Sequence, residues 1–276
     1  MNTILASTDF SNASVNAVAY AAELALQLNA RLILFHVYPI PVITSEAPIS
    51  IPPLDEIEKN CLQDLEDSAK KTGLETGGRL KIECLCKCGF VAEEIAAAVK
   101  EKKADLVVMG MQGAGYVGEN LSGSITTEFI KDSVCPVLSI PEKVKFTGLK
   151  HIVLACDYSE KFKSDWLKPL KELAVVTGSR VFVLNVVQKA VLINLKGQGA
   201  EEDQIDFSLG PIDHSFHRVH NEDAVEGINT FAASKKADLV VLIPHKLSFF
   251  AGLFHKRHTK EIAFHSNIPL LTLPEC

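Results

Sequence analysis

The sequence predicts an α/β protein made of two tandem copies of one domain, each a parallel sheet with helices on both faces. Two observations predict it: the segments of the first half recur in the second half, and short apolar runs alternate with longer helical segments. Near-continuous runs of Val, Ile and Leu are typical of strands buried on both faces. Alternating strands and helices imply right-handed crossovers, and therefore a doubly wound parallel sheet in each copy.

The internal repeat rests on four pairs of segments that occur in the same order. The chain opens with an apolar run that ends in Asp9, an aromatic residue and a serine, and the middle of the chain repeats this pattern up to Asp157. The other pairs are 31–37 with 180–186, 104–109 with 237–242, and 133–141 with 266–274. We therefore place one domain at residues 1–146 and the other at residues 147–276.

The alternation also places the elements within each half. First-half strands are expected at about residues 3–8, 31–37, 80–86, 105–110 and 136–140. Helices are expected at 12–29, 54–73, 91–102 and 124–132, and the first helix of the second half at 160–177. Such sheets bind ligands beyond the carboxyl ends of their strands, where the winding direction reverses. The informative residues should therefore follow the first and fourth strands.

Length and composition narrow the class of protein. The 276 residues suit two domains of roughly 100–150 residues each. The net charge of −6 argues against a nucleic-acid or anionic-membrane binder. No apolar run approaches the roughly 18–20 residues that span a bilayer, and the N-terminus lacks a signal-peptide pattern. Seven cysteines, an odd number, indicate reduced thiols, so we expect a cytoplasmic protein.

A glycine-rich loop follows the predicted fourth strand of the first half. Two residues separate Gly110 from Gly113, and nine more precede Gly123 and Ser124, which open the last helix. Glycines let phosphate oxygens approach backbone N–H groups, and the N-terminus of a helix attracts an anion. Thr126 adds a second hydroxyl donor beside Ser124. The loop therefore predicts a phosphate-binding site, and the alternative is a flexible loop with a serine N-cap.

With this G-x2-G-x9-G-S spacing, the chain resembles a tandem universal stress protein over essentially its whole length, once per half. The spacing is the ATP-binding signature of that family's nucleotide-binding branch. The resemblance implies two parallel five-stranded sheets of order 3-2-1-4-5, with the adenine-nucleotide α-hydrolase-like fold. It also implies pairing along the final strands, here between the two halves as an intramolecular pseudo-dimer. A further homodimer is left open.

The resemblance assigns ten residues to a cofactor site for ATP or another adenine nucleotide. Asp9, with Thr8, matches the acidic position beside the adenosine and any Mg²⁺. The backbone of Val37 matches the position that faces the adenine. The ribose and phosphate cradle is matched by Gly110, Gly113, Gly123, Ser124 and Thr126, and Met109 and Ile125 complete the set of cofactor-binding residues. Residues 104–130 contain no Lys or Arg, so the negative charge of a triphosphate would have to be met by backbone N–H groups and Mg²⁺. AMP and ADP therefore remain alternatives to ATP as the ligand.

The second half lacks this loop. Pro244 stands near the position of the first glycine, where it forbids a left-handed turn. Bulky residues fill the stretch that would cradle phosphate, namely Phe249, Phe250, Leu253 and Phe254. We expect no ordinary nucleotide site here, which leaves Asp157 as a structural cap or a relic. The apolar and basic stretch either packs into the cleft, which we favour, or docks a protein partner or an anion.

Two other patterns are weaker. Cys84, Cys86 and Cys88 alternate along a strand but lack the C-x2-C spacing of a zinc site. We expect buried or edge thiols there, with redox sensing as the alternative. The histidines at 214, 217 and 220 recur every third residue, which fits neither one strand face nor a helical zinc pair. The proline-rich segment 39–53 is expected to be a surface connection, with a flap over the adenine as the alternative.

We therefore expect a nucleotide-binding stress or regulatory protein that acts through conformation or partner binding. No Ser-His-Asp set or nucleophile elbow is present, so we expect no enzyme. A slow ATPase, or a protein that phosphorylates itself at Ser124, is one alternative. The other is a nucleotide-independent interaction protein that uses the second-half loop.

Overall fold

The computed structural model describes residues 1–38, 53–111, 126, 129–130, 133–156, 163–187, 198–243 and 268–274. The first half contains β1 (Thr3–Ser7), α1 (Asn12–Leu28), β2 (Arg31–Tyr38), α2 (Leu54–Glu75), β3 (Ile82–Cys88), α3 (Val91–Lys102), β4 (Leu106–Met111) and β5 (Val137–Pro141). The second half contains β6 (His151–Ala155), the 3-10 helix η1 (Ser164–Leu167), α5 (Lys168–Thr177), β7 (Arg180–Val187), α6 (Gln198–Leu209), β8 (His214–His220), α7 (Ala224–Ser234), β9 (Leu239–Leu242) and β10 (Leu270–Thr272).

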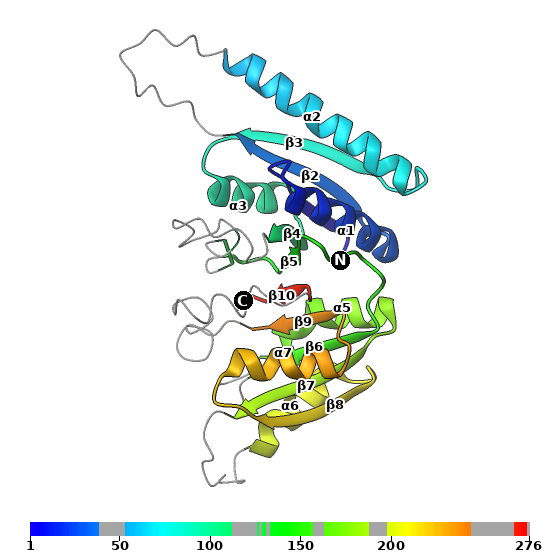
Figure 1. Cartoon of the computed structure of the whole chain (residues 1–276), viewed down its shortest axis with the longest axis vertical. Helices are drawn as coiled ribbons and strands as arrows, with labels where there is room; N and C mark the ends of the chain where they lie inside the picture. Colours follow the sequence, from blue (N-terminus) through cyan, green and yellow to red (C-terminus); the bar gives the residue numbers. More distant parts are fainter. Residues whose placement is uncertain are drawn as a thin grey trace, which may run out of the picture.

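All strands in the described residues belong to one ten-stranded sheet, ordered β3-β2-β1-β4-β5-β10-β9-β6-β7-β8 (Figure 1). Within each half the order is 3-2-1-4-5 and the strands are parallel. The halves meet at β5 and β10, which pair antiparallel with Leu271 opposite Leu138. The doubly wound α/β fold predicted from the sequence is therefore confirmed, and its two sheets form the two halves of one continuous sheet.

The predicted first-half strands and helices agree with the structure to within two residues, apart from the last helix, 124–132. Of that helix only Thr126, Phe129 and Ile130 are described. The helical segment predicted over 160–177 is helical from residue 164 to residue 177, as η1 followed directly by α5. Pro169 lies in the first turn of α5, where a residue without an N–H is tolerated, and this fixes where the α-helix begins.

Helices cover the sheet in two layers, one over a single apolar cluster that spans both halves and the other over two clusters, one in each half. Ala17, Ala21 and Leu24 on α1 are fully buried at helical spacing, and they join a cluster that continues through α5 and α6 of the second half. The opposite face is covered by α3 in the first half and by α7 in the second. The inner strands of the sheet are thus buried on both faces, and the strand ends form its two accessible edges.

Candidate functional site

The first-half site predicted from the sequence lies where β1 runs between β2 and β4, the point at which the winding direction reverses. Gly110, in β4, touches the beginning of α1 there. A Cβ atom at Gly110 would lie 2.6 Å from the backbone carbon and oxygen of Ala13 and 2.7 Å from the nitrogen of Ser14. Glycine is therefore required for close packing of strand and helix, a different reason from the loop flexibility inferred from the sequence.

Hydroxyl groups hold the turn between β1 and α1. Thr8 is buried, and its Oγ1 lies 3.0 Å from Ser14 Oγ and accepts the N–H of Phe10 at 3.0 Å. The N–H of Asp9 donates to Ser14 Oγ at 3.3 Å. Ser11 caps α1, and its Oγ accepts the N–H of Ser14 at 3.3 Å. The backbone around Asp9 is thus fixed before any ligand arrives.

The Asp9 carboxylate is exposed at the N-terminus of α1. Its Oδ1 accepts the N–H of Ser11 at 3.0 Å and the hydroxyl of Ser11 at 2.6 Å. Partial burial raises the pKa of Asp9, but hydrogen bonds from Ser11 and Ser14 outweigh it and hold the pKa below its ordinary value. Asp9 is therefore ionised at neutral pH and suited to accept hydrogen bonds from ligand hydroxyls or from metal-bound water.

Val37 lies inside β2, one residue before its end, and its side chain is buried on the α3 face. Along a strand, the polar backbone groups of every second residue point the same way. The carbonyl of Phe35 points toward β1, where it accepts the N–H of Thr8. The N–H and C=O of Val37, two residues further on, therefore point to the same side, past the last residue of β1. This orientation presents an N–H donor and a C=O acceptor above the end of β1.

Three neighbours of this site were missed from the sequence as contributors. His36 Nδ1 bonds the carbonyl of Thr8 at 2.7 Å, and its ring lies 4.7 Å from that of Phe10. Phe10 has φ of 62°, which is uncommon for a bulky residue, and Ser14 is buried beneath the turn. The aromatic residue and serine after Asp9 were the signal in the sequence, but their contact with β2 is visible only in three dimensions.

The remaining predicted site residues divide into two groups. The side chain of Met109 is buried in the α3-side cluster, so only its backbone can line a site, and Thr126 Oγ1 donates to the carbonyl of Gly110 at 3.4 Å. Gly113, Gly123, Ser124 and Ile125 lie outside the described residues, as do Asp157 and the second-half loop.

The second half differs at the same edge. Strand register places Ile243 at the position of Gly110, since β9 aligns with β6 as β4 aligns with β1. The sequence had assigned that position approximately to Pro244, the next residue. Ile243 is buried, and an isoleucine side chain is incompatible with the strand–helix approach seen at Gly110. In keeping with this, the first described helical turn of the second half is η1, at the equivalent of Asn16.

The cysteine and histidine patterns do not create a metal site within the described part of the chain, where no cluster of three or more suitable ligands exists. Cys86 is buried under α2, and burial, together with Cys61, raises the pKa of its thiol to about 12. Cys84 and Cys88 are partly buried in the same cluster. Among the described helices, none is long and apolar enough to cross a membrane.

The parallel sheet, its switch point and the fixed turn after β1 define a doubly wound α/β protein of the adenine-nucleotide α-hydrolase-like class. The model of the universal stress protein family matches residues 1–141 and again residues 148–274. The chain therefore belongs to the universal stress protein family and contains two of its domains in tandem.

Individual relatives agree with this assignment. A universal stress protein of Methanocaldococcus jannaschii is 32% identical over 143 residues, which cover 51% of this chain and 83% of the relative. One of Thermus aquaticus is 33% identical over 139 residues, covering 50% of this chain and 97% of the relative. A crystal structure of a universal stress protein from Archaeoglobus fulgidus superposes with a TM-score of 0.73 at 15% identity, covering 99% of this chain and 98% of that one, and shows the same fold.

Proposed function

We propose that this protein binds one adenine nucleotide in its first half and signals through a change of conformation or of protein partner. The observation that carries the proposal is the fixed turn after β1, where the ionised Asp9 and the backbone of Val37 face the same switch point. An acceptor for ribose hydroxyls and a donor–acceptor pair for an adenine edge are thereby held by separate strands.

The phosphates would lie on the glycine loop that begins at Gly110. The sequence supports this part of the proposal through Gly113, Gly123 and Ser124, which would provide backbone N–H groups and, as predicted, the start of a helix. Mg²⁺ would offset the phosphate charge, and the Asp9 carboxylate could help to hold it. ATP, ADP and AMP share the adenosine contacts, so the choice among them depends on the phosphate loop.

A single site per chain is part of the proposal. Gly110 lets the β4 end pack against α1, whereas Ile243 fills the equivalent space in the second half. The approach of strand to helix that shapes the first-half site therefore cannot be reproduced in the second.

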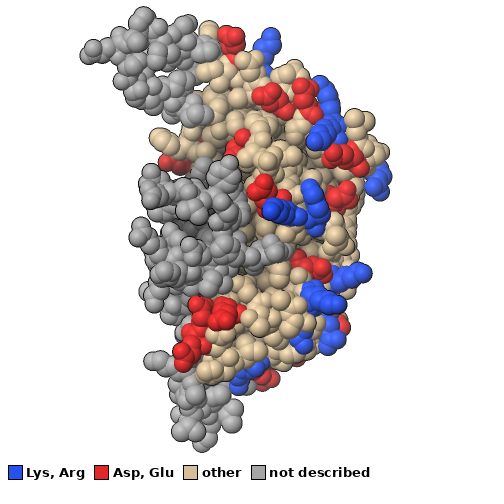
Figure 2. Space-filling view, in the orientation of Figure 1, with Lys and Arg blue, Asp and Glu red and all other residues tan. Residues whose placement is uncertain are grey.

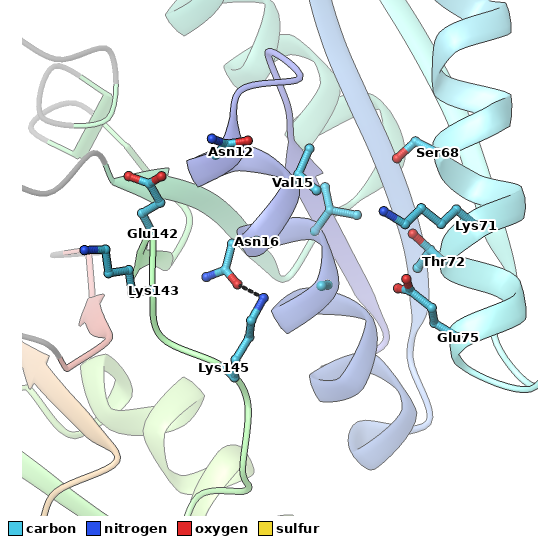
Figure 3. A pocket seen from close by; sticks show the side chains of 12 residues that line it. Asn12, Val15, Asn16, Ser68, Lys71, Thr72, Glu75, Glu142, Lys143 and Lys145 are labelled. Atoms are coloured by element: carbon cyan, nitrogen blue, oxygen red, sulfur yellow. Dashed lines mark hydrogen bonds between the residues drawn. The ribbon is translucent and has the colours of Figure 1, made fainter.

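A conformational output is supported by the polar contacts of α1. Asn16, just over one turn after the N-cap Ser11, is buried and donates from Nδ2 to the carbonyls of Pro141 at 3.1 Å and Val144 at 2.8 Å. Its Oδ1 accepts from Lys145 Nζ at 2.8 Å (Figure 3). These contacts flank a cavity of about 360 Å³ between α1, α2 and the linker between the two halves. Movement of the first turn of α1 would therefore be transmitted to that linker.

The experiment is a calorimetric titration of nucleotide-free protein with ATP, ADP and AMP, each with and without Mg²⁺. We expect Asp9→Asn to weaken binding at least about tenfold, because a charged acceptor is lost, and the matched second-half variant Asp157→Asn to leave it unchanged. A Gly113→Val and Gly123→Val double variant should abolish binding. If wild-type protein binds none of the three at millimolar concentration, the proposal is wrong.

We also propose that the bound nucleotide is not turned over. Phosphate release from ATP by the wild-type protein should not exceed that by the Gly123→Val variant. Release well above that control would instead support the slow ATPase.

A further inference from the structure

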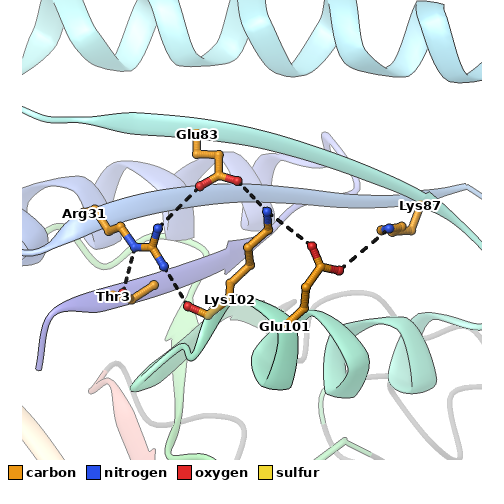
Figure 4. Close-up of polar contacts among 6 residues, drawn as sticks. All are labelled: Thr3, Arg31, Glu83, Lys87, Glu101 and Lys102. Atoms are coloured by element: carbon orange, nitrogen blue, oxygen red, sulfur yellow. Dashed lines mark hydrogen bonds and ion pairs between the residues drawn. The ribbon is translucent and has the colours of Figure 1, made fainter.

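The amino ends of β2 and β3, together with the end of α3, hold a network of paired charges that Lys87 extends along β3 (Figure 4). Arg31 Nη1 lies 3.7 Å from Glu83, and Lys102 Nζ lies 2.8 Å from the same carboxylate. Lys102 Nζ also lies 3.3 Å from Glu101, which in turn lies 3.9 Å from Lys87. The two cations that face the end of the sheet are thus each matched by an acid.

Strand register identifies the same positions in the second half. Leu32 pairs with Ile82 as Val181 pairs with His214, so Arg180 takes the place of Arg31 and Ser215 the place of Glu83. Equivalent backbone bonds, from Ala104 to Val99 and from Ala237 to Ala232, align the ends of α3 and α7. Lys235 therefore takes the place of Lys102, and Ser234 the place of Glu101. The second half therefore has a cation at both of these positions, but a serine in place of each of the two acids.

In the second half, aromatic rings lie beneath the two cations. The Arg180 guanidinium lies 5.4 Å from the centre of the Phe182 ring, and Lys235 Nζ lies 5.3 Å from the rings of both Phe182 and Phe231. His217 packs against the same two rings at 5.7 Å and 5.0 Å. By register, the first half has the aliphatic residues Ile33, Ala98 and Leu85 at the positions of these three rings.

The positive charge of this cluster is only partly compensated. Cation–π contacts orient the two cations but do not neutralise them. Asp213 lies 3.7 Å from Arg180, yet both side chains are about half exposed or more, so the pair is weak. Asp238 accepts the backbone N–H groups of Lys150 and His151, as Asp105 does for Asn2 and Thr3 in the first half. No acid forms an ion pair with Lys235 among the residues that the structure describes.

The pKa of His217 reflects this excess of positive charge. Burial lowers its pKa, and the nearby cations Lys235 and Arg180 lower it further. Its Nε2 lies 2.9 Å from Ser215 Oγ on the same face of β8. The groups around the imidazole are Arg180 on β7, Asp213 just before β8, His151 across Phe182, and Lys235 just after α7.

Figure 2 shows Lys and Arg side chains along the right-hand edge of the molecule, with acidic residues between them over the first half. The arrowheads of β3 and β9 point toward the opposite edge in Figure 1, so this is the edge of the amino ends. It lies across the sheet from the candidate nucleotide site, and a ligand here would not compete with the nucleotide.

We propose that Arg180, Lys235 and the Ser215–His217 pair form a binding site for a phosphate group, free or carried by a small metabolite. The two cations supply charge-assisted donors to its oxygens. A protonated His217 donates its Nε2–H to Ser215 Oγ, which frees the serine O–H to donate to the anion. Binding therefore takes up a proton at His217, and the anion raises the pKa of the imidazole. The affinity of the site increases as the pH falls toward that pKa.

The test follows the ring signals of His217 by NMR during titration with sulfate, inorganic phosphate and glycerol phosphate. Sulfate keeps its charge near neutral pH, so any proton uptake belongs to the protein. We expect sulfate to raise the pKa of His217 more than chloride does at equal ionic strength, since chloride only screens the two cations. Tighter binding of glycerol phosphate than of phosphate would identify an esterified ligand, and the reverse order would identify the free anion.

Two substitutions decide whether the named residues form the site. Ser215→Glu restores the acid of the first half and should weaken sulfate binding at least about tenfold, while Ser215→Thr keeps the hydroxyl and should bind as wild type. Lys235→Gln, at a partly exposed position directly after the end of α7, should also weaken sulfate binding. The proposal is overturned if none of the three anions shifts the His217 signals, or if Ser215→Glu and Lys235→Gln bind sulfate as tightly as wild type.

Discussion

The two halves of the sheet share one architecture but differ at both of their accessible edges. At the carboxyl ends, Gly110 of the first half corresponds to Ile243 of the second. At the amino ends, Glu83 corresponds to Ser215 and Glu101 to Ser234. Strand order and the helical layers are retained in both halves. The comparison teaches that a duplicated domain can change what its edges bind while its core keeps the fold.

The largest effect is expected from Ile243→Ala. Ile243 is buried in the space that α1 occupies beside Gly110 in the first half. Truncating it should leave a cavity and lower the free energy of unfolding by about 2–5 kcal/mol. Urea denaturation measures this loss. If the variant were as stable as wild type, the second half would pack here as the first half does, and the comparison would fail.

Gly110→Ala should be destabilising for the opposite reason. Its Cβ would lie 2.6 Å from the Ala13 backbone, so α1 must move away from β4, at a cost of about 1–3 kcal/mol. The same denaturation experiment measures it, with Ala155→Gly, in the core of the second half, as a control for glycine–alanine exchange alone. Neutral behaviour of Gly110→Ala would mean that the close approach is not required.

Asn16→Leu tests the contact between α1 and the linker. The change removes the partners of the Pro141 and Val144 carbonyls and of Lys145, so we expect a loss of about 1–3 kcal/mol in the free energy of unfolding. In the first described turn of the second-half helix, Ser164 accepts one bond from Ser208 at 2.7 Å, and Ser164→Ala should cost only about 0.5–1.5 kcal/mol. Equal losses in the two variants would contradict a special role for Asn16.

The smallest effect is expected from Glu83→Ser, which gives the first half the residue found in the second. The ion pairs of Glu83 are partly exposed, so we expect a loss of less than about 1 kcal/mol at low salt. Because exposed ion pairs are screened, the difference from wild type should disappear at high salt. A loss that persists at high salt would show that Glu83 contributes mainly through packing.

Much of this molecule could be predicted from its sequence because periodic apolar runs encode buried strands and amphipathic helices. The switch-point rule directed attention to the residues after the first and fourth strands, and Asp9 and Gly110 do lie at that end of the sheet, whereas Val37 was assigned only through the family resemblance. The rule could not reveal that His36 bonds the carbonyl of Thr8, since that contact depends on the register of two strands. The exchange of Glu83 for Ser215 became visible for the same reason only once both strand pairs could be aligned.

The role of Gly110 shows another limit. The sequence assigned it to a phosphate loop, which its spacing to Gly113 and Gly123 still supports. Its contact with Ala13 requires knowledge of how closely α1 approaches β4, and no local pattern encodes that distance. In the second half, the local pattern favoured Pro244 as the counterpart of Gly110. Strand register shows that Ile243, one residue earlier, occupies that position.

The central claim is that the two halves differ in nucleotide binding, and the most direct test is the number of nucleotides bound per chain. Nucleotide-free protein would be loaded with ATP, ADP and AMP separately and weighed by native mass spectrometry, beside the variants Asp9→Asn and Asp157→Asn. The account predicts a single bound nucleotide per chain, reduced by Asp9→Asn and unaffected by Asp157→Asn. Two nucleotides per chain, or one that depends on Asp157, would contradict it.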